Sequence, residues 1–269
     1  MTWQVIARQD GSVTVGSRSV KILLGLLAAV ALLAGYIYPI AAPEPITTAG
    51  FAPFVLEGLR FVIPFVAVLL TYGAVASHRE SGSIRLSLSL PHSRRDVVLG
   101  AFASRTGLVT AVSVASLLGA GALVVYPFGE LVLDRFLVFV GLTVLFGAVW
   151  CGLGLAVSLV AATRRRALVL AFALLFLFVV VWETAVAALR LGLNAAGIVD
   201  GTLPDPAQFL VGLEPSLLFE RATTGLVLPG ESVAGPWYMG EWVALGCLVL
   251  WVVGPLGLAF LRFDGSDLS

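Results

Sequence analysis

The sequence predicts an all-α integral membrane protein with six transmembrane helices. Of its 269 residues, 59% are hydrophobic and 12% are charged, and the mean hydropathy is +1.02. A soluble domain has roughly a quarter of its residues charged. The sequence also lacks the segments of about ten residues with alternating polarity that are typical of a membrane β-barrel.

Six apolar runs are long enough to cross a bilayer, which takes about 20 mostly apolar residues in a helix. They are residues 22–41, 54–76, 106–126, 136–162, 167–189 and 242–261. One such run could be a buried helix of a soluble protein, but six in one chain argue against that alternative. We therefore expect a single transmembrane domain over residues 1–269.

The distribution of Lys and Arg predicts the orientation of the chain, because short cytoplasmic loops are enriched in these residues. Most of them fall in the N-terminal arm (1–21), the second loop (77–105), the loop between spans four and five, and the C-terminal tail. The four assigned to the opposite side are Arg60, Arg135, Arg190 and Arg221. Both termini are thus expected in the cytoplasm, as an even number of spans requires.

The N-terminal arm could form a short interfacial helix. Trp3, Ile6 and Ala7 share one helical face, with Arg8 available to anionic headgroups. Gly11 and Gly16 interrupt this pattern, so a frayed arm is the alternative.

A cluster of three arginines separates spans four and five. Residues 163–166 read Thr-Arg-Arg-Arg, and burying three Arg at mid-bilayer would cost on the order of 8–10 kcal/mol. The apolar run that surrounds them is therefore expected to be two helices joined by a tight cytoplasmic turn.

The outer loop, residues 190–241, is long but not polar. Its apolar pieces around 191–199 and 208–218 are separated by Gly201, Pro204, Pro206 and Pro215. Pieces this short cannot cross a bilayer, so re-entrant or interfacial helices are expected. Small residues four apart, such as Ser116 and Ala120 in span three and Ala148 and Gly152 in span four, further predict close helix packing within the bundle or at a subunit interface.

The charged segment 78–100 after the second span has two interpretations. Residues 83–90 alternate polar and apolar, which favours a strand, but Glu80, Ile84 and Leu88 also share a helical face. In the helical interpretation Pro91 ends one short helix, and Ser93 caps a second whose first turn holds Asp96. The two helices would present Arg85, Arg94 and Arg95 to the cytoplasm.

This segment resembles that of the ABC-2-type transporter permeases. In that family the second span is followed by Glu, Gly-Thr-Leu, a Leu-rich turn, Leu-Pro-Val-Ser-Arg and Gly-Lys. The matching positions here are Glu80, Gly82-Ser83-Ile84, residues 86–90, Pro91-His92-Ser93-Arg94 and Gly100-Ala101. His92 and Ala101 depart from the family pattern. The N-terminal arm, the six spans and the long outer loop extend the resemblance over the whole chain.

The resemblance implies a permease subunit whose second loop carries a coupling helix that rests on separate ABC ATPase subunits. The residues implied in this coupling are Glu80, Gly82, Arg85, Pro91, Ser93, Arg94 and Arg95. It further implies a second permease subunit, identical or different, and transport in the export direction. The sequence has no Gly-x-x-x-x-Gly-Lys-Ser/Thr motif, so we expect no ATPase activity of its own.

Glu183 is the candidate residue of a translocation path, because ionisable groups inside spans are often functional. We interpret it as the one carboxylate well inside a span; a structural hydrogen bond is the alternative role. No catalytic residue, cofactor, metal site or nucleic-acid partner is expected. Besides the ATPase subunits and a second permease subunit, membrane lipids are the expected partners.

Two other functions stay open at this point, namely a carrier or channel driven by an ion gradient and a membrane anchor for a cytoplasmic complex. The excess of Arg over Lys suggests the cell membrane of a prokaryote with a GC-rich genome.

Overall fold

The structure is a computed structural model that describes residues 2–80, 93–126, 129–228, 230, 233 and 235–264, with the backbone alone at Thr2, His78, Arg79 and Asp264. The predicted coupling residues Gly82, Arg85 and Pro91 lie outside the described residues.

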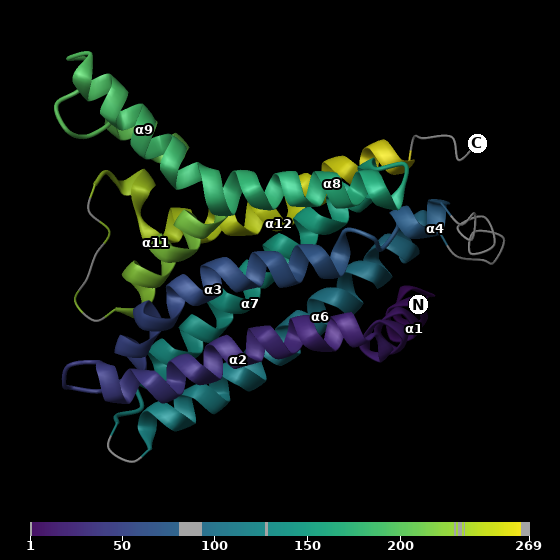
Figure 1. The fold of residues 1–269 in the computed structure, drawn as a ribbon, viewed down its shortest axis with the longest axis horizontal. Coiled ribbons are helices and arrows are strands. Elements are labelled where there is room, and N and C mark those ends of the chain that lie inside the picture. Colours follow the sequence, from purple (N-terminus) through teal and green to yellow (C-terminus); the bar gives the residue numbers. More distant parts are fainter. Residues whose placement is uncertain are drawn as a thin grey trace.

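Six spans in the described part of the chain are long and apolar enough to cross a membrane, which confirms the predicted fold class. Each span is a single helix except the fifth in chain order. That span is built from three consecutive segments that run on without a break (Figure 1). The spans are α2 (Arg18–Ala41), α3 (Thr48–Thr71), α6 (Arg94–Val125), α7 (Leu133–Val160), α8 (Arg164–Leu175) with the π-helix η1 (Phe176–Val181) and α9 (Trp182–Ala195), and α12 (Glu241–Asp264).

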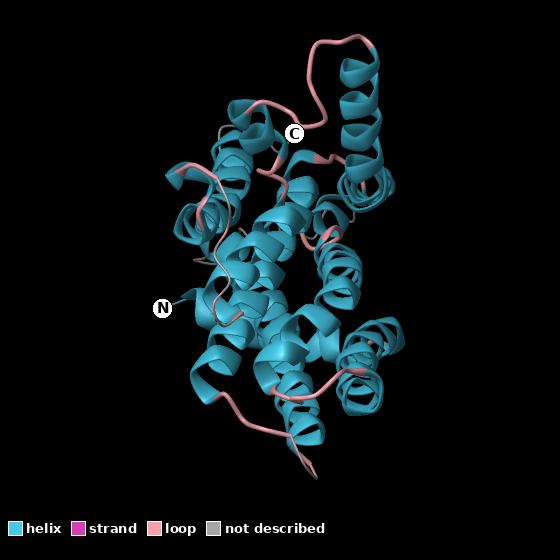
Figure 2. Ribbon diagram, turned by 90° about the vertical axis from the view of Figure 1, so that its left-hand side faces the viewer, coloured by secondary structure: helices cyan, strands magenta, loops and turns pink. Residues whose placement is uncertain are grey.

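Shorter helices occupy both ends of this bundle. They are α1 (Thr2–Gly16), α4 (Ala76–Glu80), α10 (Asp205–Val211), α11 (Pro215–Val227) and the 3-10 helix η2 (Trp237–Met239). Figure 2 shows helices and loops without a strand in the part described. One isolated bridge, Thr47 to Glu130, joins the loop before α3 to the loop before α7.

The N-terminal arm forms a helix that packs against the start of α6. α1 continues through Gly11 to Gly16, so the glycines do not interrupt it. A Cβ at Gly100 would lie 2.7 Å from Ile6 Cγ2, which shows how closely α1 and α6 approach. The start of α1, helix α4 and the end of α12 all lie at the same end of the bundle (Figure 1).

The second loop differs from the sequence prediction at both of its ends. α3 ends at Thr71 instead of residue 76, and a turn leads into α4. The helix capped by Ser93 is not a separate short helix, because α6 runs for 32 residues from Arg94 into the third span. The cap itself is as predicted: Ser93 Oγ accepts from Asp96 N at 3.2 Å, and Asp96 Oδ2 accepts from Ser93 N at 3.1 Å.

Helices α3 and α7 form the centre of the bundle. In each, 67% of the most apolar window is buried, against 11% for the span α8–η1–α9. Aromatic rings fill the core beside α11, where Phe146 and Phe219 stack with centroids 4.5 Å apart. The face formed by α8, η1 and α9 is therefore largely uncovered in the single chain.

The outer loop is only partly as predicted. Leu191 to Ala195 extend α9 instead of forming a separate helix, and α9 projects beyond the bundle (Figure 1). The second apolar piece is divided between α10 and α11, because Gly212 to Glu214 interrupt it. The placement of these helices at or in the membrane stays a prediction.

Candidate functional site

Glu80 lies at the end of α4 and contacts the beginning of α8. Its Oε2 accepts a hydrogen bond from Arg164 N at 3.0 Å. Thr163 Oγ1 accepts from Arg166 N in the same turn. Since the first N–H groups of a helix have no partner within it and carry partial positive charge, a carboxylate there is stabilising. Glu80 thus joins the second loop to the arginine turn.

Arg94 and Arg95, at the start of α6, both pack on the end of α12. Arg94 Nη1 donates to Phe263 O at 2.8 Å, and its guanidinium lies 5.5 Å from the centroid of the Phe263 ring. The guanidinium of Arg95 lies 6.0 Å from the centroid of the Phe260 ring. Arg94 is partly buried, whereas Arg95 is exposed. Of the two, Arg95 is the more accessible to a partner protein.

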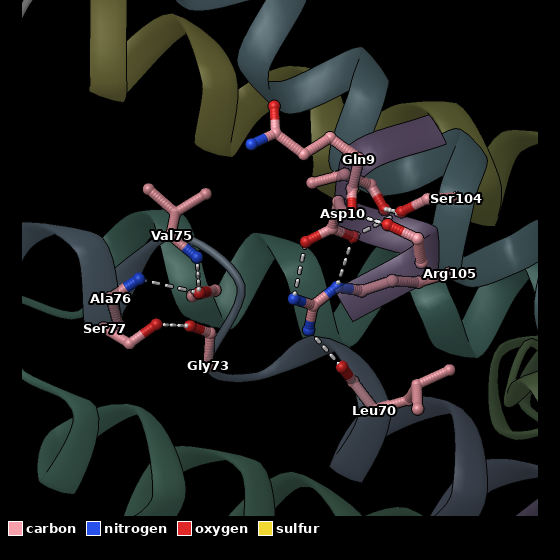
Figure 3. Close-up of polar contacts among 12 residues, drawn as sticks. Gln9, Asp10, Leu70, Gly73, Val75, Ala76, Ser77, Ser104 and Arg105 are labelled. Atoms are coloured by element: carbon pink, nitrogen blue, oxygen red, sulfur yellow. Dashed lines mark hydrogen bonds and ion pairs between the residues drawn. The ribbon is translucent and has the colours of Figure 1, made fainter. Parts of the chain in front are cut away.

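Arg105, which the sequence indicated only as one of the cytoplasmic arginines, connects three helices (Figure 3). Its Nη2 donates to Asp10 Oδ1 at 3.1 Å and its Nε to Asp10 Oδ2 at 3.2 Å. Its Nη1 donates to Leu70 O, in the last turn of α3. Ser104 Oγ also donates to Asp10. The side chains of Arg105 and Asp10 are only 13% and 19% exposed, so this is a largely buried ion pair.

The turn between α3 and α4 is fixed to α7 by one serine. Ser158 Oγ accepts from Val75 N at 2.9 Å and from Ala76 N at 3.1 Å (Figure 3). All three residues are buried. Each end of the second loop is therefore held by polar contacts to other helices: α7 and α8 on one side, and α1, α3 and α12 on the other.

A second group of charged residues surrounds Arg60, near the middle of α3. Its Nη1 donates to Glu57 Oε1 at 2.9 Å and to Glu220 Oε2 at 2.8 Å, and its Nη2 donates to Glu183 Oε1 at 2.5 Å. Arg60 is 10% exposed, while Glu57, Glu183 and Glu220 are 75%, 65% and 43% exposed. We call these four residues the Arg60 cluster. It joins α3, α9 and α11.

The sequence prediction for this region was wrong on one point and incomplete on another. Glu183 is not the one carboxylate inside a span, because Glu57 lies in α3 as well. Arg60 was used only to assign the orientation of the chain, and its ion pairs were not predicted from the sequence. The Glu57–Arg60 pair, spaced i,i+3 within an apolar run, could have indicated this cluster, because charges inside a span are costly unless they are paired.

Glu214 lies beside this cluster at the start of α11, in the outer loop. Its Oε2 accepts from Leu217 N at 2.8 Å and so caps the helix. The side chain is 2% exposed, and its Oε1 has no hydrogen-bond partner. Burial raises the pKa of the Glu214 carboxyl, although hydrogen bonds from Ser216 and Leu217 and the charge of Arg60 oppose this shift.

Members of the Arg60 cluster line two cavities. The smaller, of about 100 Å³, is lined by Arg60, Glu57, Glu183 and Glu214 together with Phe61, Phe178, Val179 and Ser216. The larger, of about 610 Å³, opens between α9, α10 and α11 and includes Glu220, Arg221 and Arg190. The π-helix η1 carries Phe178 and Val179, and such insertions frequently occur at functional sites.

The fold and these charged contacts define a multi-pass membrane protein with an anchored polar loop after its second span. A family model described as ABC-2 family transporter protein matches residues 5–268. The chain therefore belongs to the ABC-2 transporter family and is the membrane subunit of an ABC transporter.

Two curated relatives are similar to the chain. One is a probable ABC transporter permease protein NosY from Pseudomonas aeruginosa, 30% identical over 212 residues, which are 74% of this chain and 74% of the relative. The other is a probable ABC transporter permease protein NosY from Stutzerimonas stutzeri, 26% identical over 201 residues, which are 71% of this chain and 69% of the relative. Family membership favours the permease interpretation over a gradient-driven carrier or an anchor.

Proposed function

We propose that this permease uses ATP hydrolysis by separate ABC ATPase subunits to export a substrate across a prokaryotic cell membrane. In this proposal residues 1–269 act as one permease domain, and the second loop is the contact surface for the ATPase. The proposed contact residues are Glu80, Gly82, Arg85, Pro91, Ser93, Arg94 and Arg95.

The observation that carries this proposal is the anchoring of the second loop. Glu80 contacts α8, Ser158 holds the turn before α4, and Arg94 and Arg105 tie the start of α6 to α12, α1 and α3. Because these contacts connect packed helices, a displacement of the loop would be passed to most of the bundle.

The positions of the charges support a cytoplasmic location for this loop and for both termini. Arg94 and Arg95 lie at the start of α6, which packs against α1, and the arginines 164–166 lie at the start of α8, which contacts α4. Short loops rich in Arg remain on the cytoplasmic side. A reporter enzyme that is active only in the cytoplasm, fused after Ser269, checks this orientation.

A second permease subunit, of the same or a different chain, would cover the face formed by α8, η1 and α9. Only 11% of the apolar window in this span is buried, and Glu183 is 65% exposed on it. An exposed carboxylate in an apolar span is unfavourable against lipid but suits a water-filled path. We therefore place the translocation path between the two subunits, with Glu183 on its wall.

Affinity purification of the tagged chain from its native host tests the proposal. We expect ABC ATPase subunits to be recovered with it, and Arg95→Glu to reduce their recovery several-fold because a favourable contact becomes repulsive. The matched control is Glu44→Arg, a charge reversal at an exposed residue of the loop between α2 and α3. Recovery without any ATPase, or equal recovery for both variants, would contradict the proposed contact.

A further inference from the structure

The small cavity beside Arg60 holds more negative than positive charge. Glu57 and Glu183 line it together with Arg60, which leaves one negative charge in excess, while Glu220, the third carboxylate on Arg60, also lies near the charge of Arg221. Like charges held close together repel one another unless a cation compensates them. The cluster is therefore incomplete with respect to charge.

Glu214 provides an independent indication that the cavity takes a ligand. It lines the cavity, it is 98% buried, and its Oε1 has no hydrogen-bond partner. A buried oxygen without a partner costs free energy, and most such groups in native proteins are satisfied by protein, water or a ligand.

Two aromatic side chains also line the cavity. Phe61 and Phe178 line it, and the ring of Trp182 lies 5.6 Å from that of Phe178, measured between centroids. The faces of aromatic rings attract organic cations. Carboxylates together with aromatic rings are the combination that recognises an ammonium group on an apolar body.

A metal ion fits this cavity less well. Within the described ranges no group of three or more His, Cys, Asp or Glu residues is arranged to hold one. The guanidinium of Arg60 lies among the carboxylates and repels any cation, but it repels a divalent metal ion about twice as strongly as a monovalent ammonium group. An ammonium group, by contrast, could donate hydrogen bonds to several carboxylate oxygens at once.

We propose that the cavity beside the Arg60 cluster binds the ammonium group of an organic cation, with the apolar body of that cation against Phe61 and Phe178. This inference rests on the proposed transport function and names the class of its substrate as amphipathic amines. Glu183, the exposed carboxylate on α9, would meet the amine first, and the buried Glu214 would accept from it inside the cavity.

Three small molecules with one skeleton test this proposal: phenethylammonium, neutral phenylethanol and anionic phenylacetate. Their binding to the purified permease in lipid nanodiscs is measured by saturation-transfer NMR, which requires neither ATP nor the ATPase. We expect phenethylammonium to bind, and the other two to give no signal above empty nanodiscs. Equal signals from all three would show apolar partitioning and would overturn the proposal.

Glu183→Gln then locates the site. It leaves Arg60 paired with Glu57 and Glu220 while it removes one negative charge, so we expect affinity for phenethylammonium to fall about tenfold, as for the loss of one charged hydrogen bond. Glu44→Gln, in the loop between α2 and α3, is the matched control and should bind like the unmodified protein. Unchanged affinity in Glu183→Gln, with a normal elution profile, would refute the site.

Binding and coupling can fail separately. If the amine binds but no ATPase is recovered with the chain, the ligand site stands and the proposed function falls. If the ATPase is recovered but the amine does not bind, the permease function stands and the substrate class is wrong.

Discussion

The carboxylate of Asp10 receives hydrogen bonds from both Nε and Nη2 of Arg105, which fastens the N-terminal helix α1 to α6. The same guanidinium also donates to Leu70 O near the end of α3. One side chain thus links the arm before the first span to both helices that flank the second loop (Figure 3). Through this link, a displacement of the loop would reach α1 as well.

Asp10→Asn should destabilise the protein by about 1–3 kcal/mol, because it leaves a largely buried guanidinium without its charge partner. Thermal unfolding in detergent measures this loss, and faster proteolysis of residues 2–16 should accompany it. The control is Asp134→Asn, whose side chain is 79% exposed and lies 3.6 Å from Arg135 Nε. An exposed pair of this kind contributes at most about 1 kcal/mol. Equal unfolding temperatures for the two variants would contradict a stabilising role for the Asp10–Arg105 pair.

Ser158→Ala should loosen the turn between α3 and α4. It removes the acceptor for two buried N–H groups, those of Val75 and Ala76, at a cost of about 1–3 kcal/mol. Hydrogen exchange at these two amides should become faster, while exchange in the centre of α7 should not change. Ser116→Ala is the control, since Ser116 is also buried but its hydroxyl donates only to Ser113 O within α6. Unchanged exchange at Val75 and Ala76 would show that the serine does not hold the turn.

The sequence predicted features that depend on neighbouring residues. Long apolar runs predicted six spans, and the arginines 164–166 correctly separated α7 from α8. The cap formed by Ser93 and Asp96 was also visible, because both residues lie within one turn. Composition and local spacing were sufficient for these features.

Features that depend on distant residues were missed. α3 begins at Thr48, before the predicted residue 54. The cap that Thr47 gives to Gly50 N is a local signal that was not used, whereas the hydrogen bond from Val132 N to Thr48 Oγ1 joins positions 84 residues apart. The contact between Arg60 and Glu183 joins positions 123 residues apart. No periodicity in the chain signals such a pairing, so it emerges only once α9 is placed beside α3.

Stability at neutral pH should increase in Glu214→Gln. Burial raises the pKa of the Glu214 carboxyl above its ordinary value of 4.5. At a pH between 4.5 and this raised pKa, the carboxyl is ionised in the unfolded chain but still protonated in the folded protein. Stability that depends on Glu214 therefore falls as the pH rises through this window and does not return above it. The amide oxygen of Gln can still accept from Leu217 N.

The unfolding temperatures of Glu214→Gln and the unmodified protein should thus agree near pH 4 and separate by pH 8, with the variant higher. Glu44→Gln, which removes an exposed carboxylate, controls for the change of one charge and should show no such separation. A Glu214→Gln protein that is less stable than the original at pH 8 would contradict the assignment of a buried, destabilising carboxylate.

Gly154→Ala should force α3 and α7 apart. A Cβ at position 154 would collide with Thr71 Oγ1 and would lie 3.0 Å from Val68 Cα, and a backbone atom cannot move away without shifting the helix. Overpacking of this kind costs about 1–3 kcal/mol. Gly141→Ala is the matched control in the same helix, because a Cβ there has nothing within 4 Å and Ala favours a helix by up to about 1 kcal/mol over Gly. The two substitutions should therefore change the unfolding temperature in opposite directions. If Gly154→Ala is as stable as Gly141→Ala, the close approach of α3 and α7 at this point is refuted.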